Sequence, residues 1–150
     1  MCLEPGIGPE RMTESNKATL PEGNPESPLE TILLVEDDDA VRAVTSRALL
    51  RFGYTVLAAE GGPEALKLLQ DHGETIDLLL TDIMMPGMNG VEVARRIVEE
   101  RPGIRVFFMS GYADQDLVRQ GLLAPGTHFI QKPFTPFELV ERVRRILDGK

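Results

Sequence analysis

Residues 78–90 read LLLTDIMMPGMNG, in which an apolar run ends on Asp82 and a loop containing proline and glycine follows at once. A short apolar run bounded by such a loop is typical of a strand that is buried on both faces. We therefore expect Asp82 to lie where a strand leaves the core. An aspartate in that position either caps the following turn or helix, or acts as a nucleophile or metal ligand at the edge of a sheet.

The same alternation of apolar runs and helical patterns continues through the chain from residue 30. The predicted strands are residues 31–35, 54–58, 77–81, 104–109 and 127–131. The predicted helices follow them and begin near Asp38 or Asp39, Gly61, Gly90, Asp114 and Pro136. Five strand–helix pairs in alternation predict an α/β fold, in which a parallel sheet is covered by helices on both faces.

The first and last of these helices have apolar faces that can be read from residue spacing. In the first, Val41, Val44 and Ala48 fall on one face, which we expect to pack inward. In the last, the apolar positions are Leu139, Val140, Val143, Ile146 and Leu147. Both stripes are therefore predicted to cover the sheet.

Composition narrows the classes of function. The chain has 150 residues and a formal net charge of −8, which argues against direct binding of nucleic acid and favours a divalent cation as ligand. No apolar run approaches the roughly 20 residues that a membrane-spanning helix needs, and no secretory signal is recognisable. Cys2 is the one cysteine, so no internal disulfide can form. These features predict a cytoplasmic protein with no membrane partner.

Residues 1–29 differ in composition from the remainder of the chain. They carry five of the eleven prolines and show no apolar periodicity. Such a segment cannot bury enough surface to offset the entropy lost on ordering. We predict a flexible tail or linker over residues 1–29 and one folded domain over residues 30–150.

Chemically active side chains follow four of the five predicted strands. Because the carboxyl ends of parallel strands lie at one edge of the sheet, these side chains are expected to meet there. They are Glu36 and Asp37 after the first strand, Asp82 after the third, Ser110 after the fourth and Lys132 after the fifth. Three carboxylates, a hydroxyl and an ammonium are thus predicted to form one site.

The combination of groups favours phosphoryl transfer. Three neighbouring carboxylates repel one another, and a hard divalent cation with oxygen ligands, such as Mg²⁺, relieves that repulsion. Lys132 and Ser110 can neutralise charge on the oxygens of a transferring phosphoryl group. Asp82 can then attack phosphorus and form an acyl phosphate.

On these residues the chain resembles the receiver domain of two-component response regulators over roughly residues 30–150. The matching motifs are Glu36-Asp37 after an apolar run, Asp82 before MPGMNG, Ser110 after Met109, and Lys132-Pro133 before Phe134. The segments FFMSGY and QKPFT look most like receivers attached to hybrid sensor kinases. The resemblance implies a flavodoxin-like, doubly wound, five-stranded sheet of order 2-1-3-4-5 with five helices.

The resemblance also implies roles for the site residues. Asp82 would accept a phosphoryl group from a histidine kinase or a histidine phosphotransfer protein. Asp37 would bind Mg²⁺ directly, Glu36 mainly through water, and Met84 through its backbone carbonyl. Lys132 would pair with the phosphoryl group, and the Lys132-Pro133 peptide bond would be cis.

A conformational switch is the further implication. Ser110 would move toward the phosphoryl group, and Phe129 would turn inward behind it, although plain core packing explains Phe129 equally well. Phosphorylation would change a partner-binding surface formed by the fourth helix, the fifth strand and the fifth helix. Two departures from the family pattern are Glu36, where Asp is common, and Gly111, where Ala is frequent.

Two other functions remain open from the sequence. One is a degenerate receiver that serves only as a docking module. The other is a phosphatase of the haloacid dehalogenase class, which also uses a phospho-aspartate but places a second Asp two residues after it, where this chain has Met84. The sequence favours the signalling receiver, which catalyses only its own phosphorylation and dephosphorylation, because all five site residues are present.

Overall fold

The computed structural model describes residues 30–149. The predicted tail over residues 1–29 lies outside the described residues. Five strands form one parallel sheet of order β2-β1-β3-β4-β5, which confirms the predicted topology. The strands are β1 (Thr31–Val35), β2 (Thr55–Ala59), β3 (Ile76–Asp82), β4 (Arg105–Ser110) and β5 (Phe129–Gln131).

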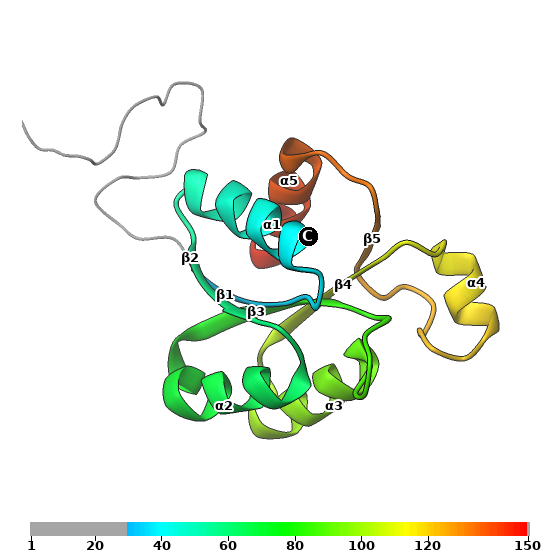
Figure 1. Cartoon of the computed structure of the whole chain (residues 1–150), viewed down its shortest axis with the longest axis horizontal. Coiled ribbons are helices and arrows are strands. Elements are labelled where there is room, and N and C mark those ends of the chain that lie inside the picture. The colour runs from blue at the N-terminus through cyan, green and yellow to red at the C-terminus, as the bar shows by residue number, and fades with distance from the viewer. Residues whose placement is uncertain (1–29, 150) are drawn as a thin grey trace, which may run out of the picture.

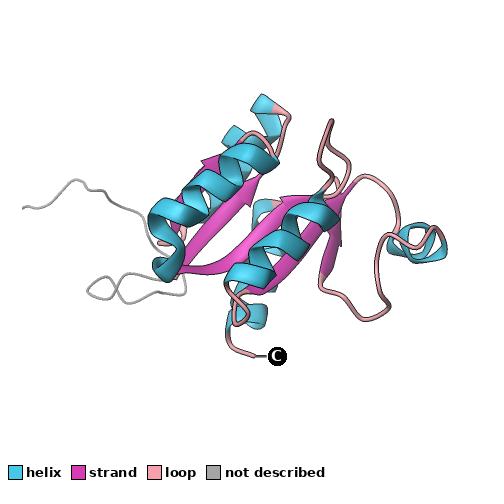
Figure 2. Ribbon diagram, turned by 90° about the horizontal axis from the view of Figure 1, so that it is seen from below, coloured by secondary structure: helices cyan, strands magenta, loops and turns pink. Residues whose placement is uncertain are grey.

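Helices cover both faces of the sheet. One face carries α1 (Asp39–Arg51) and α5 (Pro136–Leu147), and the other carries α2 (Gly62–His72) and α3 (Gly90–Glu100), as Figures 1 and 2 show. A short 3₁₀ helix, Gly73–Thr75, follows α2, and the six-residue α4 (Asp114–Arg119) lies beyond the β5 end of the sheet (Figure 1). No helix within residues 30–149 has the length and apolar character needed to cross a membrane.

The core is divided by the sheet into two apolar layers. Successive strand residues point to opposite faces, so Leu33 and Val35 pack toward α2 and α3 while Ile32 and Leu34 pack toward α1 and α5. All four of these side chains are fully buried. A continuous apolar strand is the expected sequence pattern for a parallel strand covered on both faces.

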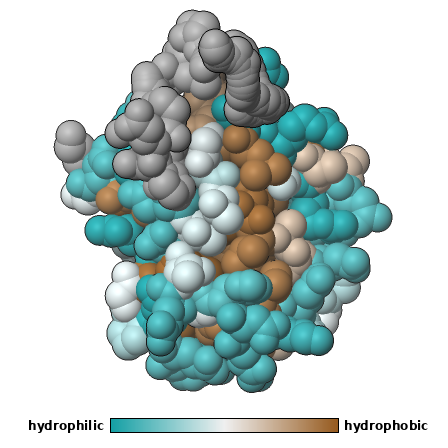
Figure 3. All heavy atoms as spheres, turned by 90° about the vertical axis from the view of Figure 1, so that its left-hand side faces the viewer, coloured by the Kyte–Doolittle hydropathy of each residue, from teal (hydrophilic) through white to brown (hydrophobic). Residues whose placement is uncertain are grey.

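The edge of the sheet formed by β2 is less completely covered. Figure 3 faces the side of the molecule on which β2 lies and shows an apolar band between hydrophilic flanks. Val56 and Leu57 of β2 are half-buried, in contrast to the fully buried residues of β1. The sheet is therefore best protected at its centre, where the polar side chains of the site emerge.

The predicted inward face of α1 is wrong at one position. Val44 is 56% exposed, whereas the buried residues of α1 are Thr45, Ala48 and Leu49. Two overlapping stripes are available on this helix, because Val44 and Thr45 both lie about one turn before Ala48. Packing against α5 and β2 selects the stripe that contains Leu49, and residue spacing alone could not make that choice.

The fifth strand is two residues shorter than predicted. Thr127 forms a turn instead, because its N–H and its hydroxyl both donate to the carbonyl of Ala124. Gly126 has a φ of 84°, a backbone conformation that glycine adopts without strain. The last helix agrees with the prediction: Thr135 and Glu138 form a capping box at its start, and its five predicted apolar residues are all buried.

Candidate functional site

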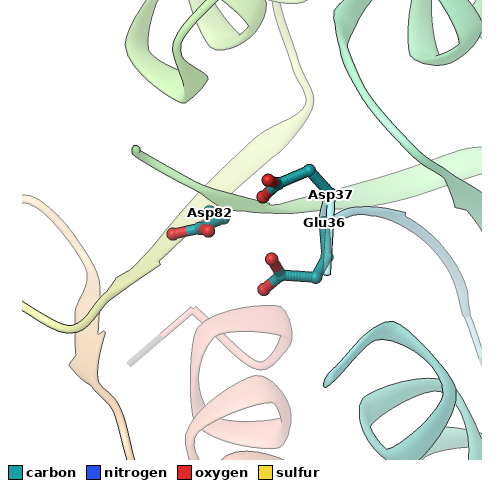
Figure 4. A group of neighbouring side chains, drawn as sticks. All are labelled: Glu36, Asp37 and Asp82. Carbon is teal, nitrogen blue, oxygen red and sulfur yellow. The ribbon is translucent and has the colours of Figure 1, made fainter. Parts of the chain in front are cut away.

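Three carboxylates converge at the carboxyl ends of β1 and β3, which are neighbouring strands. The side chains of Glu36, Asp37 and Asp82 each place an oxygen within 4.8 Å of the others, and Figure 4 shows Glu36 and Asp37 extending toward the side on which Asp82 lies. Glu36 is 1% exposed and Asp82 is 5% exposed, while Asp37 lies at the surface. The predicted acidic cluster is therefore present, and Asp37 is its solvent-exposed member.

Lys132 completes this cluster from the far end of the chain. Its Nζ lies 2.8 Å from Oε1 of Glu36 and 3.3 Å from Oδ2 of Asp82. The backbone N–H of Lys132 donates to the carbonyl of Ser110, and the Lys132-Pro133 peptide bond is cis, as the family resemblance implied. The fold thus places an ammonium against two buried carboxylates.

The burial of these charges shifts their proton affinities. Burial raises the pKa of Glu36 to about 7; the charge of Asp82 adds to this effect, and the hydrogen bond from Lys132 opposes it. Burial alone would lower the pKa of Lys132, but the hydrogen bond to Glu36 and the charge of Asp82 outweigh it and raise that pKa. Lys132 therefore stays cationic, and Glu36 gains or loses a proton near neutral pH.

The loop between β1 and α1 is held by hydrogen bonds within the acidic run. Asp38 caps α1 by accepting from the N–H of Val41, so of the two residues near which this helix was predicted to begin, Asp38 is the cap and Asp39 is the first helical residue. The N–H of Asp38 donates to Oε2 of Glu36, and Nη1 of Arg42 donates to the carbonyl of Glu36 at 2.8 Å. The contribution of Arg42 was missed from the sequence, although an arginine one turn into a helix that begins with acidic residues was a usable signal.

The position of Asp82 depends on a close approach between β3 and α3. A Cβ on Gly90 would lie 2.0 Å from the backbone oxygen of Asp82, a distance that no real structure tolerates. The N–H of Gly90 also donates to the carbonyl of Ile83. The sequence predicts only a helix start at Gly90, because the approach of two backbones leaves no signature in residue spacing.

Ser110 and Phe129 lie on the two strands beyond Asp82. Ser110 is fully buried, and its hydroxyl accepts a hydrogen bond from the N–H of Tyr112 at 3.1 Å. Phe129 is half-buried, lies in register with Phe108 and packs against the apolar layer on the α2–α3 side. Both residues therefore lie on strands that end beside the acidic cluster.

The donor set fits a hard divalent cation. Glu36, Asp37 and Asp82 offer carboxylate oxygens, which are the ligands that Mg²⁺ prefers, and among residues 30–149 no thiolate or imidazole belongs to the cluster. Met84, which lies two residues after Asp82 in the loop that leaves β3, has a side chain that is 47% exposed. The chemistry of the cluster thus agrees with the predicted magnesium site.

An apolar hollow adjoins the cluster on the side of Lys132. It has a volume of about 310 Å³ and lies between the start of α1 and the loop after β5. Its lining residues are Ala40, Val41, Val44, Thr45, Lys132, Pro133 and Phe134. The exposed Val44 therefore faces a recess that opens next to the charged site.

The sequence matches a known family over most of its length. The family described as response regulator receiver domain matches residues 32–144. Sensor kinase CckA of Brucella abortus (strain 2308) is 38% identical over 118 residues, which are 79% of this chain and 12% of that protein. Response regulator receiver protein CpdR of the same organism is 36% identical over 119 residues, which are 79% of this chain and 98% of that protein. The chain thus spans a small part of the sensor kinase and nearly all of CpdR.

Solved structures with the same fold agree with these matches. The crystal structure of the CheX–CheY–BeF₃–Mg²⁺ complex from Borrelia burgdorferi matches with a TM-score of 0.71 and 26% sequence identity. The match covers 79% of this chain and 90% of that chain.

Proposed function

The chain belongs to the response regulator receiver domain family, and we propose that it is a phosphorylatable receiver of a two-component phosphorelay, with Asp82 as the phosphoryl acceptor. The observation that carries the proposal is the contact of Lys132 with both Glu36 and Asp82 at the acidic end of the sheet. A buried carboxylate beside an ammonium and two further carboxylates has the charge pattern that in-line phosphoryl transfer needs.

In the proposed reaction an oxygen of Asp82 attacks the phosphorus of a phosphohistidine. The new bond joins that oxygen to phosphorus, the phosphorus–nitrogen bond breaks, and its electron pair stays on the imidazole of the donor. Lys132 neutralises charge on the phosphoryl oxygens, and the hydroxyl of Ser110 supplies a further hydrogen bond to them. These two groups replace the water that would otherwise solvate the transferring group.

Magnesium is the cofactor that we propose for this site. Asp37 and Asp82 would bind the ion, with Glu36 acting mainly through water and the carbonyl of Met84 completing the protein ligands. When bound, Mg²⁺ would offset the repulsion between the carboxylates and the incoming phosphoryl group. The similar CheY chain was crystallised with BeF₃ and Mg²⁺, which supports this assignment.

The proposed donor is a protein, either a histidine kinase or a histidine phosphotransfer protein. The apolar hollow beside Lys132 supports a protein donor, because Val44 and Phe134 offer apolar surface next to a charged reaction centre. We further propose that Ser110 and Phe129 move on phosphorylation and change a surface formed by α4, β5 and α5 for a downstream partner. The chain then has no catalytic activity beyond its own phosphorylation and dephosphorylation.

The proposal is tested with acetyl phosphate and Mg²⁺, followed by intact mass. We expect one phosphoryl group on the wild-type chain and none on Asp82→Asn or in the presence of a chelator. Asp77→Asn is the matched control, because Asp77 lies on the same strand but accepts a hydrogen bond from the N–H of Thr31 at the opposite end of the sheet. Asp37→Ala should lose phosphorylation through loss of the metal.

The remaining outcomes would assign another function. A wild-type chain that gains no phosphate from acetyl phosphate or from any histidine donor is a docking module. Continuous release of phosphate from unrelated monoesters would instead identify a phosphatase of the haloacid dehalogenase class.

A further inference from the structure

The side chain of Arg142 joins α5 to the last two strands of the sheet. Its Nη2 donates a hydrogen bond to the backbone carbonyl of Phe129 in β5, and its guanidinium carbon lies 5.6 Å from the centre of the Phe107 ring in β4. Phe107 is fully buried and Arg142 is half-buried. A guanidinium that both covers an aromatic face and donates to a carbonyl is held in one orientation.

The carbonyl of Phe129 lies on the open edge of the sheet. The carbonyl of His128 accepts from Phe108, and the N–H of Lys132 donates to Ser110, so residues 128 and 132 both face β4. In a parallel strand, the backbone N–H and carbonyl groups of alternate residues face the same neighbouring strand. The N–H and the carbonyl of Phe129 therefore point away from β4. Within residues 30–149 no strand lies beyond β5, so Arg142 satisfies a carbonyl that the ladder of these strands does not reach.

The other charged side chains of α5 are engaged elsewhere. Glu138 belongs to the capping box at the start of the helix, and Glu141 pairs with Arg145. Arg144 pairs with Glu30 and Asp148 at the opposite end of the sheet. Among the hydrogen bonds and ion pairs of residues 30–149, the contact from Arg142 is the one that ties a side chain of α5 to the backbone of β5.

We propose that Arg142 is a positioning residue that couples Phe129 to α5. Phe129 is the proposed switch residue of β5, and Phe107 lies three residues before Ser110, the proposed switch residue of β4. One side chain of α5 therefore contacts both strands that change, and a displacement of the Phe129 backbone moves α5 through the guanidinium. This inference rests on the proposed function, because phosphorylation of Asp82 supplies the displacement.

A purely structural role predicts a different outcome. If Arg142 only covers an open strand edge, its loss lowers stability but leaves the response of α5 to phosphorylation intact. If Arg142 couples the two elements, its loss separates their responses. The measurement must therefore follow β5 and α5 separately, before and after phosphorylation.

The test uses the full chain with acetyl phosphate and Mg²⁺, and reads amide hydrogen exchange in peptides from β5 and from α5. In the wild type we expect exchange in both segments to change. In Arg142→Met, which keeps the apolar stem, we expect the same phosphate uptake and the same change in β5, with the change in α5 lost. Arg145→Met is the matched control on the same helix and should behave as the wild type.

The other outcomes of this experiment also support or contradict the coupling by Arg142. If Arg142→Met takes phosphate and α5 responds as in the wild type, the inference is wrong and the proposed function stands. If the wild type takes no phosphate, the proposed function is wrong. The inference then fails with it, because phosphorylation of Asp82 is the source of the displacement. Should Arg142→Met fail to fold, Arg142→Lys keeps the charge but lacks the planar fork; a diminished α5 response supports the coupling, and a full response contradicts it.

Discussion

The ammonium of Lys132 lies 2.8 Å from a carboxylate oxygen of Glu36, although the two residues are 96 positions apart in the sequence. Glu36 is almost completely buried, so its charge is screened by neighbouring protein groups and not by water. The contact therefore links the stability of the fold to the chemistry of the site, since the cation that balances Glu36 is also the proposed ligand of the phosphoryl group.

Replacing Lys132 by Met should destabilise the chain and abolish phosphorylation. At a pH well above the pKa of Glu36, Glu36 and Asp82 would be left as buried carboxylates without a counter-charge, which typically costs about 3 kcal/mol of unfolding free energy. Mg²⁺ should restore part of that loss because it supplies a replacement cation. Urea unfolding in chelator and in Mg²⁺ measures both effects, with Lys67→Met on the exposed side of α2 as control. Equal stability of Lys132→Met and the wild type in chelator would contradict the prediction.

The raised pKa of Glu36 predicts how stability depends on pH. The folded-state pKa of about 7 lies above the ordinary value of 4.5, so between these values the folded chain binds more protons than the unfolded chain. Stability from this group is therefore greatest below the ordinary value and falls as pH rises toward about 7, by at most about 1.4 kcal/mol per pH unit.

Glu36→Gln should remove this dependence. Urea unfolding without Mg²⁺ across the same window should show a shallower fall for Glu36→Gln than for the wild type. The affinity of the wild type for Mg²⁺, measured by calorimetry, should weaken as pH falls through about 7, because protons compete with the ion. An identical pH slope in the two proteins would show that Glu36 does not carry the effect.

The parallel sheet and the convergence of the charged residues could be predicted because both depend on local signals, whereas the strand order 2-1-3-4-5 was implied by the resemblance to receiver domains. Each apolar run marks a strand, and the residue after the run is carried to the carboxyl edge. Parallel topology then brings Glu36, Asp82 and Lys132 together whatever the helices do. The five-residue apolar face of α5 was predicted for a similar reason, since one stripe of that helix is clearly more apolar than the others.

The features that were missed depend on contacts between elements. The choice between Val44 and Leu49 as the inward side of α1 is made by α5 and β2, which a single helical pattern does not describe. The hydrogen bond from Arg42 to the carbonyl of Glu36 and the backbone approach at Gly90 are distances in space, with no period in the sequence. These contacts fix the local geometry around the site, whereas the ends of the strands determine which residues form it.

Gly90→Ala should destabilise the chain, although helix propensity alone predicts the opposite. Alanine in a helix is favoured over glycine by about 1 kcal/mol. The added Cβ would, however, lie 2.0 Å from the backbone oxygen of Asp82, and backbone atoms cannot yield as a flexible side chain can. We expect a loss of about 2–3 kcal/mol in unfolding free energy and slower phosphorylation of Asp82.

Gly111→Ala is the control for this prediction. A Cβ on Gly111 meets nothing within 4 Å. The unfolding free energy of the Gly111→Ala variant should therefore differ from that of the wild type by less than about 0.5 kcal/mol. Urea unfolding and acetyl phosphate labelling of both variants provide the comparison. A Gly90→Ala chain as stable as Gly111→Ala would mean that α3 can shift without disturbing Asp82.

Val44→Glu should separate small donors from protein donors. Val44 is 56% exposed and lines the apolar hollow beside Lys132, so a carboxylate there should hinder a protein that buries the hollow but not a small molecule that reaches Asp82. We expect unchanged labelling by acetyl phosphate. Transfer from a phosphorylated histidine protein should be slowed by about tenfold or more, equivalent to about 1.4 kcal/mol.

Leu50→Glu is the matched control, because Leu50 is 55% exposed on the same helix but does not line the hollow. Equal slowing by both variants would indicate a general effect of charge on α1, and no slowing by Val44→Glu would exclude the hollow from the donor contact.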